Sequence, residues 1–204
     1  MSADPPMLSI SGAVEGFLDQ AVFERLVLHV GGSPGRVFGM HGRPHLLERL
    51  RGYNAAALHA PWLVLVDLDR DQCASLLISK WLPDPAPHMC FRIAIRSIES
   101  WLMADRERLA RHLSVSTAVV PTNPDSLPDA RTAMVNLAGR SSRTSVAGAM
   151  VPKAGSGRPV GPGYVGQLMR FVSDPRTGWR PEVAMGHSDS LRRCVAAIEQ
   201  QLVR

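Results

Sequence analysis

The sequence predicts an α/β protein with a mostly parallel central sheet flanked by helices, the Rossmann-like arrangement, and an irregular C-terminal extension that ends in a helix. Short apolar runs alternate with amphipathic segments over residues 1–112. The clearest run, WLVLVDLD at 62–69, indicates a strand buried on both faces. With 204 residues, 45% of them hydrophobic, the chain can build one large core. We therefore expect a single domain, with an α/β core over 1–112 and a loop-rich basic extension over 113–204.

Four strands and four helices are expected in the first half of the chain. Each strand is a short apolar run, and each helix has apolar residues at three- and four-residue spacing. A glycine-rich segment that starts at Gly31 ends the first helix, and Pro61 precedes the third strand. The expected strands cover 7–14, 36–40, 62–69 and 90–95, and the expected helices cover 17–30, 44–60, 71–82 and 97–113.

The regular alternation is lost in the second half, where loop-forming residues dominate. Three prolines predict one loop, and a stretch rich in Gly, Ser and Pro with interspersed basic residues predicts a second, ordered and irregular loop. Amphipathic spacing predicts a docked helix at the C-terminus. The expected elements are a loop over 120–129, a helix over 130–139, the irregular basic loop over 141–166, a helix over 164–172 and the C-terminal helix over 188–204.

The charges are unevenly distributed along the chain. The formal net charge is +5, yet 13 basic and 14 acidic residues precede Arg140, whereas 10 basic and 4 acidic residues lie from Arg140 onward. A basic C-terminal portion favours a polyanionic partner, and arginine is the better bidentate ligand for phosphate. An arginine bias also arises from base composition alone, so both interpretations stay open.

Composition and cysteine use exclude several classes of protein. No apolar run approaches the roughly 20 residues of a membrane-spanning helix. The first residues, MSADPPML, lack the basic and apolar regions of a signal peptide. The three cysteines form neither a CxxC motif nor an even set for a disulfide framework. We expect a cytoplasmic protein that does not associate with a membrane.

Acidic residues follow the ends of three predicted strands. Glu15 follows the first strand, Asp67 and Asp69 close the third, and Glu99 lies just beyond the fourth. The carboxyl ends of parallel strands meet at one sheet edge, where ligands bind, so we expect these acids to converge. Clustered carboxylates need cations, and hard oxygen ligands select Mg²⁺ or Mn²⁺, as one ion or as two about 4 Å apart.

Structural roles compete for two of these acids. Glu15 can simply complement the dipole of the helix that follows it. Glu99 can form a structural ion pair with Arg92 or Arg96. The acids of the DLD motif at 67–69 are harder to explain in this way, because they end a buried apolar strand at the edge where ligands bind. We therefore expect the DLD acids to be functional.

These residues resemble the Toprim domain, which is shared by topoisomerases, bacterial primases, small ribosomal-RNA maturases and OLD-family nucleases. The resemblance depends on VEGFLD at 14–19 and on the DLD motif. More closely, the chain resembles a bacterial family of unknown function in the Toprim-like clan, over roughly residues 8–203, through GYNAAALHAPWLVLVDLDRDQCASLL, MCFRIAIRSIESWLMAD and VPKAGSGRPVGPGY. Members of that family are often encoded beside an AAA or ABC-type ATPase, in an arrangement similar to two-part OLD-type defence systems.

The resemblance implies roles for individual acids. Glu15 corresponds to the Toprim glutamate, and the DLD motif corresponds to the metal-binding DxD pair. Asp19 has the spacing of a second acid in OLD-type members, one helical turn on, so that it can face the same ion as Glu15. Asp71 either joins the metal ligands or caps the following helix. The expected metal ligands are Glu15, Asp19, Asp67, Asp69 and Asp71, and the expected catalytic residues are Glu15, Asp67, Asp69, Glu99 and Lys153.

Basic residues of the C-terminal portion are expected to bind the phosphate backbone of a nucleic acid. The resemblance implies that those of PKAGSGR stand where a basic group can meet the scissile phosphate. The same segment lacks the GK[ST] ending of a Walker A motif, so we do not expect this chain to bind ATP by itself. The expected nucleic-acid-binding residues are Arg140, Arg143, Lys153, Ser156 and Arg158.

The combined features predict a Mg²⁺- or Mn²⁺-dependent phosphodiesterase. The first hypothesis is a DNA nuclease or nickase of a phage-defence system that works with a separate ATPase. A second is a Toprim-like module without catalysis, which binds nucleic acid or the ATPase. A third is RNA processing; DNA is favoured, although no RNA-specific signature separates the two substrates.

Overall fold

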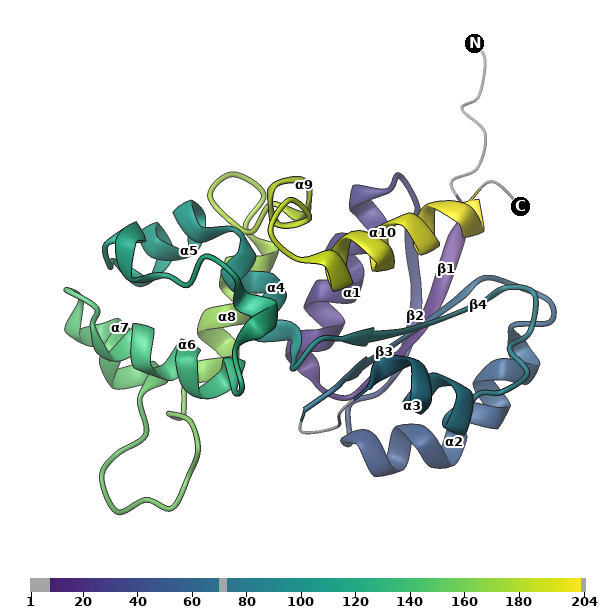
Figure 1. Ribbon diagram of the computed structural model, residues 1–204, viewed down its shortest axis with the longest axis horizontal. Helices are drawn as coiled ribbons and strands as arrows, with labels where there is room; N and C mark the ends of the chain where they lie inside the picture. Colours follow the sequence, from purple (N-terminus) through teal and green to yellow (C-terminus); the bar gives the residue numbers. More distant parts are fainter. Residues whose placement is uncertain (1–7, 70–72, 203–204) are drawn as a thin grey trace, which may run out of the picture. The chain divides into compact units, whose positions relative to one another are not determined.

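The centre of the fold is a sheet of four parallel strands, which confirms the expected α/β class. Figure 1 shows the computed structural model, which describes residues 8–69 and 73–202. The strand order is β2-β1-β3-β4, and the sheet is flanked by helices. The strands are β1 (Ser9–Val14), β2 (Ser33–Gly39), β3 (Trp62–Asp67) and β4 (Met89–Ala94).

The strand β1 pairs in parallel with a neighbour on each side. Ser9 lies opposite Ser33 of β2, and Ala13 lies opposite Val64 of β3. Parallel pairing places the carboxyl ends of the strands on one edge of the sheet. Gly12 is required inside β1, because a Cβ there would lie 2.4 Å from the ring of Phe23.

Contacts divide the chain into two compact units. The first contains the described residues of Met1–Val66, Ser75–Arg92 and Arg193–Arg204. The second contains the described residues of Asp67–Ala74 and Ile93–Arg192. Glu15 therefore belongs to the first unit, whereas Asp67 and the residues that follow β4 belong to the second.

Helices cover both faces of the sheet in the first unit. Side chains of α2 and α3 pack with Val64, Val66 and Phe91 in one apolar cluster. On the opposite face, Gly12 meets Phe23 of α1, and the described residues of α10 from Arg193 onward close the same side. The helices are α1 (Phe17–His29), α2 (Arg43–Ala56), α3 (Ala74–Trp81) and α10 (Asp189–Leu202).

The second unit is mainly helical and has a core of its own. Trp101 and Trp179 are fully buried, and the indole N–H of Trp179 donates a 3.0 Å hydrogen bond to the Trp101 carbonyl. Two 3₁₀ turns, Thr117–Val119 and Pro124–Ser126, occupy the expected proline-rich region. The helices are α4 (Ile98–Ala104), α5 (Arg106–Leu113), α6 (Ala130–Gly139), α7 (Thr144–Met150), α8 (Tyr164–Ser173) and α9 (Pro181–Ala184).

The sequence-based prediction was wrong about two segments of the second unit. A continuous helix was expected over 97–113, but it breaks at Asp105, whose carboxylate accepts the amide N–H of Arg108 and so begins α5. An irregular loop was expected over 141–166, but its first part forms α7, because Val146 and Met150 are buried there. Tertiary packing thus determines the secondary structure of both segments.

The helices are short. The longest among the described residues, α2 and α10, have 14 residues each. Of the helices in this part of the chain, none combines the length and the apolar character that a bilayer crossing requires.

Candidate functional site

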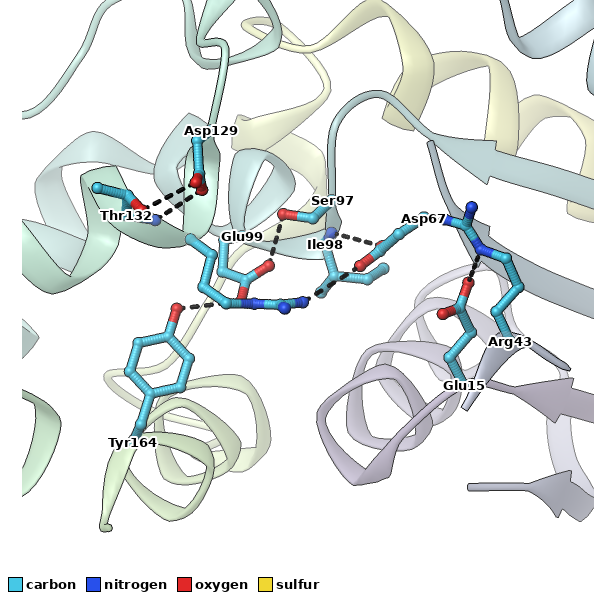
Figure 2. Close-up of polar contacts among 10 residues, drawn as sticks. Glu15, Arg43, Asp67, Ser97, Ile98, Glu99, Asp129, Thr132 and Tyr164 are labelled. Carbon is cyan, nitrogen blue, oxygen red and sulfur yellow. Dashed lines mark hydrogen bonds and ion pairs between the residues drawn. The ribbon is translucent and has the colours of Figure 1, made fainter. Parts of the chain in front are cut away.

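Two buried carboxylates of the second unit, Asp67 and Glu99, share one arginine (Figure 2). Asp67 is the last residue of β3 and is 6% exposed, and Glu99, in the first turn of α4 after β4, is 2% exposed. A guanidinium nitrogen of Arg131 lies 3.7 Å from Asp67 Oδ2, and its Nε lies 3.2 Å from Glu99 Oε1. One positive charge therefore contacts both acids, which come from the ends of neighbouring strands.

The carboxylate of Glu99 is held by three donors. Ser97 Oγ donates to Oε2 at 2.6 Å, while Tyr164 Oη and Arg131 Nε donate to Oε1 at 3.0 and 3.2 Å. These donors come from the strand–helix junction, from α8 and from α6. Hydrogen bonds to a charged acceptor are stronger than neutral ones, so Glu99 is fixed in position.

The carboxylate of Asp67 joins the end of β3 to the start of α4. The Ile98 amide N–H donates to Asp67 Oδ1 at 3.0 Å. This contact accounts for one of the amides that a helix N-terminus leaves without an intrahelical acceptor. Oδ2 of the same carboxylate faces Arg131.

The local structure of α6 positions Arg131. Asp129 caps this helix by accepting the amide N–H and the hydroxyl of Thr132, both at 2.8 Å. The side chain of Arg131 is 47% exposed, although the acids that it contacts are buried. Burial alone lowers the pKa of Arg131, but the negative charges of Glu99 and Asp67 raise it by more, so the net shift is upward. Arg131 is therefore a fully charged cation with one side open to solvent.

Tyr164 completes the polar cluster as a neutral donor. Burial, and then the negative charge of Glu99, raises the pKa of its hydroxyl above the usual value of 10.0. Tyr164 accordingly keeps its proton at neutral pH and donates it to Glu99 in a hydrogen bond.

The backbone beyond β3 and β4 is left-handed at two non-glycine residues. Asp69 has φ 51° and Arg96 has φ 62°. They are tied together, because the Asp69 amide donates to the Arg96 carbonyl at 2.7 Å and the Arg96 side chain donates to the Asp69 carbonyl at 3.2 Å. Such a conformation costs roughly 1–2 kcal/mol per residue. Asp69 is exposed whereas Asp67 is buried, so the two acids of the DLD motif differ in environment.

The predicted acids of the first unit lie near the start of α1. Glu15 Oε1 accepts a 3.3 Å hydrogen bond from Arg43 Nε, and the guanidinium of Arg43 lies over the Trp81 ring. Asp19 is in the first turn of α1, where a negative charge complements the helix dipole. The structure thus gives Glu15 a cationic side chain as a partner.

Among residues 8–69 and 73–202, no group of three or more His, Cys, Asp or Glu side chains is arranged to hold a metal ion. Asp71 lies outside this range. The Asp67 and Glu99 pair still fits Mg²⁺, because proteins commonly hold this ion through one or two carboxylates while water and substrate phosphates complete its shell.

The predicted nucleic-acid-binding residues occupy two places in the second unit. Arg140 caps the end of α6, and the guanidinium of Arg143, before α7, donates to the His112 carbonyl. Lys153, Ser156 and Arg158 are all exposed on the loop between α7 and α8, which Figure 1 shows extending from these helices. Arg143 thus takes part in the fold, whereas the loop presents its charges to solvent.

The basic loop has a fixed base beside the acid cluster. Its final glycines donate to α7, with Gly161 N–H to the Met150 carbonyl at 2.9 Å and Gly163 N–H to the Ala149 carbonyl at 2.8 Å. The next residue is Tyr164, which donates to Glu99. The sequence therefore connects the basic loop directly to a residue of the carboxylate cluster.

Sequence reasoning missed the partners of the acids. Arg131 and Tyr164 were not singled out, although Tyr164 ends the quoted GPGY motif. Arg131 carries no local signal, since it contacts residues 32 and 64 positions earlier in the chain only after folding. Comparisons with protein-family models, curated proteins and solved structures found no match to this chain.

Proposed function

We propose that this chain is a divalent-metal-dependent phosphodiesterase that acts on nucleic acid, with Asp67 and Glu99 as its central carboxylates. The observation that carries the proposal is the guanidinium of Arg131, which contacts both buried acids. The two carboxylates already share the guanidinium cation of Arg131, so the same place is suited to a metal cation. Arg131 is half-exposed, so its side chain can leave for solvent while the acids stay in place.

The donor set suits Mg²⁺ or Mn²⁺. Carboxylate oxygens are hard ligands, and Asp67 and Glu99 would hold the ion together with water or phosphate oxygens. When bound, such an ion activates water and stabilises the charge of the leaving oxygen. Asp69, in the same unit, remains a further candidate ligand through the Toprim resemblance, and metal-binding roles for Glu15 and Asp19 stay predictions from that resemblance.

Residues of the chain itself would orient the reacting groups. The Ile98 amide and the hydroxyls of Ser97 and Tyr164 hold the two carboxylates, which limits their reorganisation during the reaction. Lys153 and Arg158 on the exposed loop would bind the phosphate backbone. DNA as substrate and a separate ATPase as partner in a defence system belong to this proposal through the resemblance.

Plasmid nicking with Asp67→Asn tests the proposal. Asparagine keeps an oxygen for the Ile98 amide but removes the negative charge, so the fold should survive. With Mn²⁺, we expect nicking to fall by more than about 100-fold, beyond the loss typical of residues that only orient metal ligands. Glu107→Gln, an exposed acid of the same unit, is the matched control. Equal nicking by Asp67→Asn and the control would refute the assignment.

The alternative, a binding module without catalysis, is favoured by a different observation. Asp67, Glu99 and Glu15 each contact an arginine already, and the described residues contain no group of three metal-ligating side chains. Under this alternative, the chain binds nucleic acid or the ATPase and does not cleave nucleic acid. DNA binding without cleavage in Mg²⁺ and Mn²⁺, even with the ATPase present, would select this alternative.

A further inference from the structure

The first unit contains a basic pocket between the end of β2 and the first three turns of α2. Its volume is about 330 Å³, near the lower end of the range for small-ligand sites. No carboxylate is among the residues that line it, and four of those residues are basic. The lining residues are Arg36, Val37, Phe38, Gly39, Met40, His41, His45, Arg49 and Tyr53.

The spacing along α2 explains how these side chains meet. His45, Arg49 and Tyr53 are four residues apart in sequence and so lie on one face of the helix. His41 precedes the helix, and its ring packs edge-on against His45 at 4.9 Å between centroids. Arg36 comes from β2 and lies over the Phe38 ring at 4.8 Å. Two elements thus bring four basic groups to one cavity.

The connection between β2 and α2 is tightly constrained. Gly39 has φ 93°, and a Cβ there would lie 2.2 Å from the Val14 carbonyl oxygen. Met40 is left-handed at φ 65°, and its amide donates to the same Val14 carbonyl at 3.0 Å. Backbone strain of this kind clusters at ligand sites in other proteins. The wall of the pocket is therefore set by the backbone and does not depend on side-chain packing alone.

The pocket presents two exposed guanidinium groups and a buried imidazole nitrogen. Arg49 Nε donates to His45 Nε2 at 3.0 Å, which places the proton of the neutral imidazole on Nδ1. His45 Nδ1 is buried and has no hydrogen-bond partner in the structure. Within the described part of the chain, neither Arg36 nor Arg49 forms an ion pair with a carboxylate. An anionic oxygen in the cavity would pair with both guanidinium groups.

We propose that this pocket binds the phosphate group of a nucleotide, either free or as part of a nucleic-acid strand. Planar guanidinium groups match phosphate oxygens in a bidentate manner, and Arg36 and Arg49 both line this cavity. The inference goes beyond the proposed function, since binding here requires neither a metal ion nor cleavage.

Binding of two probes to the full chain in EDTA tests the proposal. The probes are AMP and a short 5′-phosphorylated single-stranded oligonucleotide, measured by calorimetry and by fluorescence anisotropy. EDTA removes metal-dependent binding, so failure here is distinct from failure of the nuclease proposal. Arg49→Gln and Arg36→Gln each remove one cation from the pocket. Arg51→Gln is the matched control, because Arg51 is exposed on the same helix and does not line the cavity.

We expect at least one probe to bind with a Kd below about 1 mM, which is the weak end of measurable affinity. Each pocket variant should weaken binding about tenfold, and Arg51→Gln less than twofold. Displacement of the strand by AMP would identify a pocket for either source of phosphate, and binding of only one probe would identify that source. Absence of binding by both, or equal losses in Arg51→Gln and Arg49→Gln, would overturn the proposal.

Discussion

Two clusters of the second unit pair buried carboxylates with an arginine, and they use the arginine differently. Asp105 is 0% exposed and accepts the amide, Nε and Nη2 of Arg180 at 3.0, 2.9 and 2.7 Å, besides the Arg108 amide. Arg180 Nη2 also lies 3.2 Å from the exposed carboxylate of Glu107. In the other cluster, Arg131 contacts two buried acids. It lies 3.2 Å from Glu99 and, in a longer contact, 3.7 Å from Asp67. Arg180 thus closely holds a single buried acid, whereas Arg131 is shared between two buried acids.

The difference separates a structural ion pair from a candidate binding site. Asp105 lies at the break between α4 and α5, so Arg180 ties that break to the segment before α9. Arg131 is half-exposed and contacts acids that other donors already orient. Arg180 therefore holds the fold together, whereas our proposal is that a metal cation takes the place of Arg131.

The largest loss of stability is expected for Arg180→Gln. Removing one partner of a buried ion pair leaves the other charge without compensation, and with the amide contacts to Asp105 retained the cost should be about 3 kcal/mol. Urea unfolding followed by circular dichroism measures it. Added Mg²⁺ should not change the loss, and a cost below about 1 kcal/mol would remove the contrast with Arg131.

A smaller loss, with a different response to metal, is expected for Arg131→Gln. Solvent already screens this guanidinium, so we expect a loss of about 1.5 kcal/mol in EDTA. Mg²⁺ at about 10 mM should then raise the Tm of this variant by more than that of the unmodified chain, because a ligand that binds the folded state stabilises it. If Mg²⁺ raised the Tm of Arg131→Gln and Arg180→Gln equally, both arginines would have a structural role only.

Tyr164→Phe probes the orientation of Glu99. The variant loses one of three donors to a buried carboxylate, and we expect a cost of about 1 kcal/mol at pH 7. The raised pKa of Tyr164 stabilises the folded state fully below the unfolded pKa of about 10, and this contribution is lost as pH rises further. Thermal melts should therefore show the gap between variant and unmodified chain narrowing above about pH 10. A constant gap would contradict a buried neutral Tyr164.

Asp174→Asn gives the smallest effect and supplies an exposed counterpart to the buried acids. Hydrogen bonds, first from the Thr177 hydroxyl and then from the Thr177 and Arg176 amides, lower the pKa of Asp174 to about 2. Its contribution to stability is present above the unfolded pKa of about 3.9 and is lost as pH falls through the folded value. Melting curves should show a small decrease in Tm at pH 7 that disappears near pH 2. If the decrease in Tm persisted at pH 2, it would not come from the lowered pKa of Asp174.

The sheet was predictable because each strand is a short apolar run, a signal that lies within the strand's own sequence. The run at 62–69 yielded β3, and the acids at strand ends yielded Asp67 and Glu99. The break at Asp105 was not predictable, because its carboxylate is held by Arg180, 75 residues later in the chain. For α7, the sequence TSVAGAM has weak helix propensity, and burial of Val146 and Met150 compensates for it.

The chemistry of the candidate site was predictable only in part. A strand-end pattern identifies which carboxylates lie at the ligand edge, and Asp67 and Glu99 meet the same arginine. It does not identify the cations and hydroxyls that fill the space between them, because Arg131 and Tyr164 arrive from separate helices. Nor does the alternation in DLD reveal that Asp69 takes a left-handed, exposed conformation.

Mn²⁺ binding to four proteins tests most directly whether Asp67 and Glu99 form a cation site that Arg131 occupies. Titration calorimetry would compare the unmodified chain with Asp67→Asn and Arg131→Gln, and Glu107→Gln would serve as the control. We expect Asp67→Asn to weaken Mn²⁺ binding at least tenfold and Arg131→Gln to strengthen it, since removal of the competing charge favours the metal. Identical affinities in all four proteins, or no binding up to about 10 mM, where even a weak site would show, would contradict a metal site at these acids.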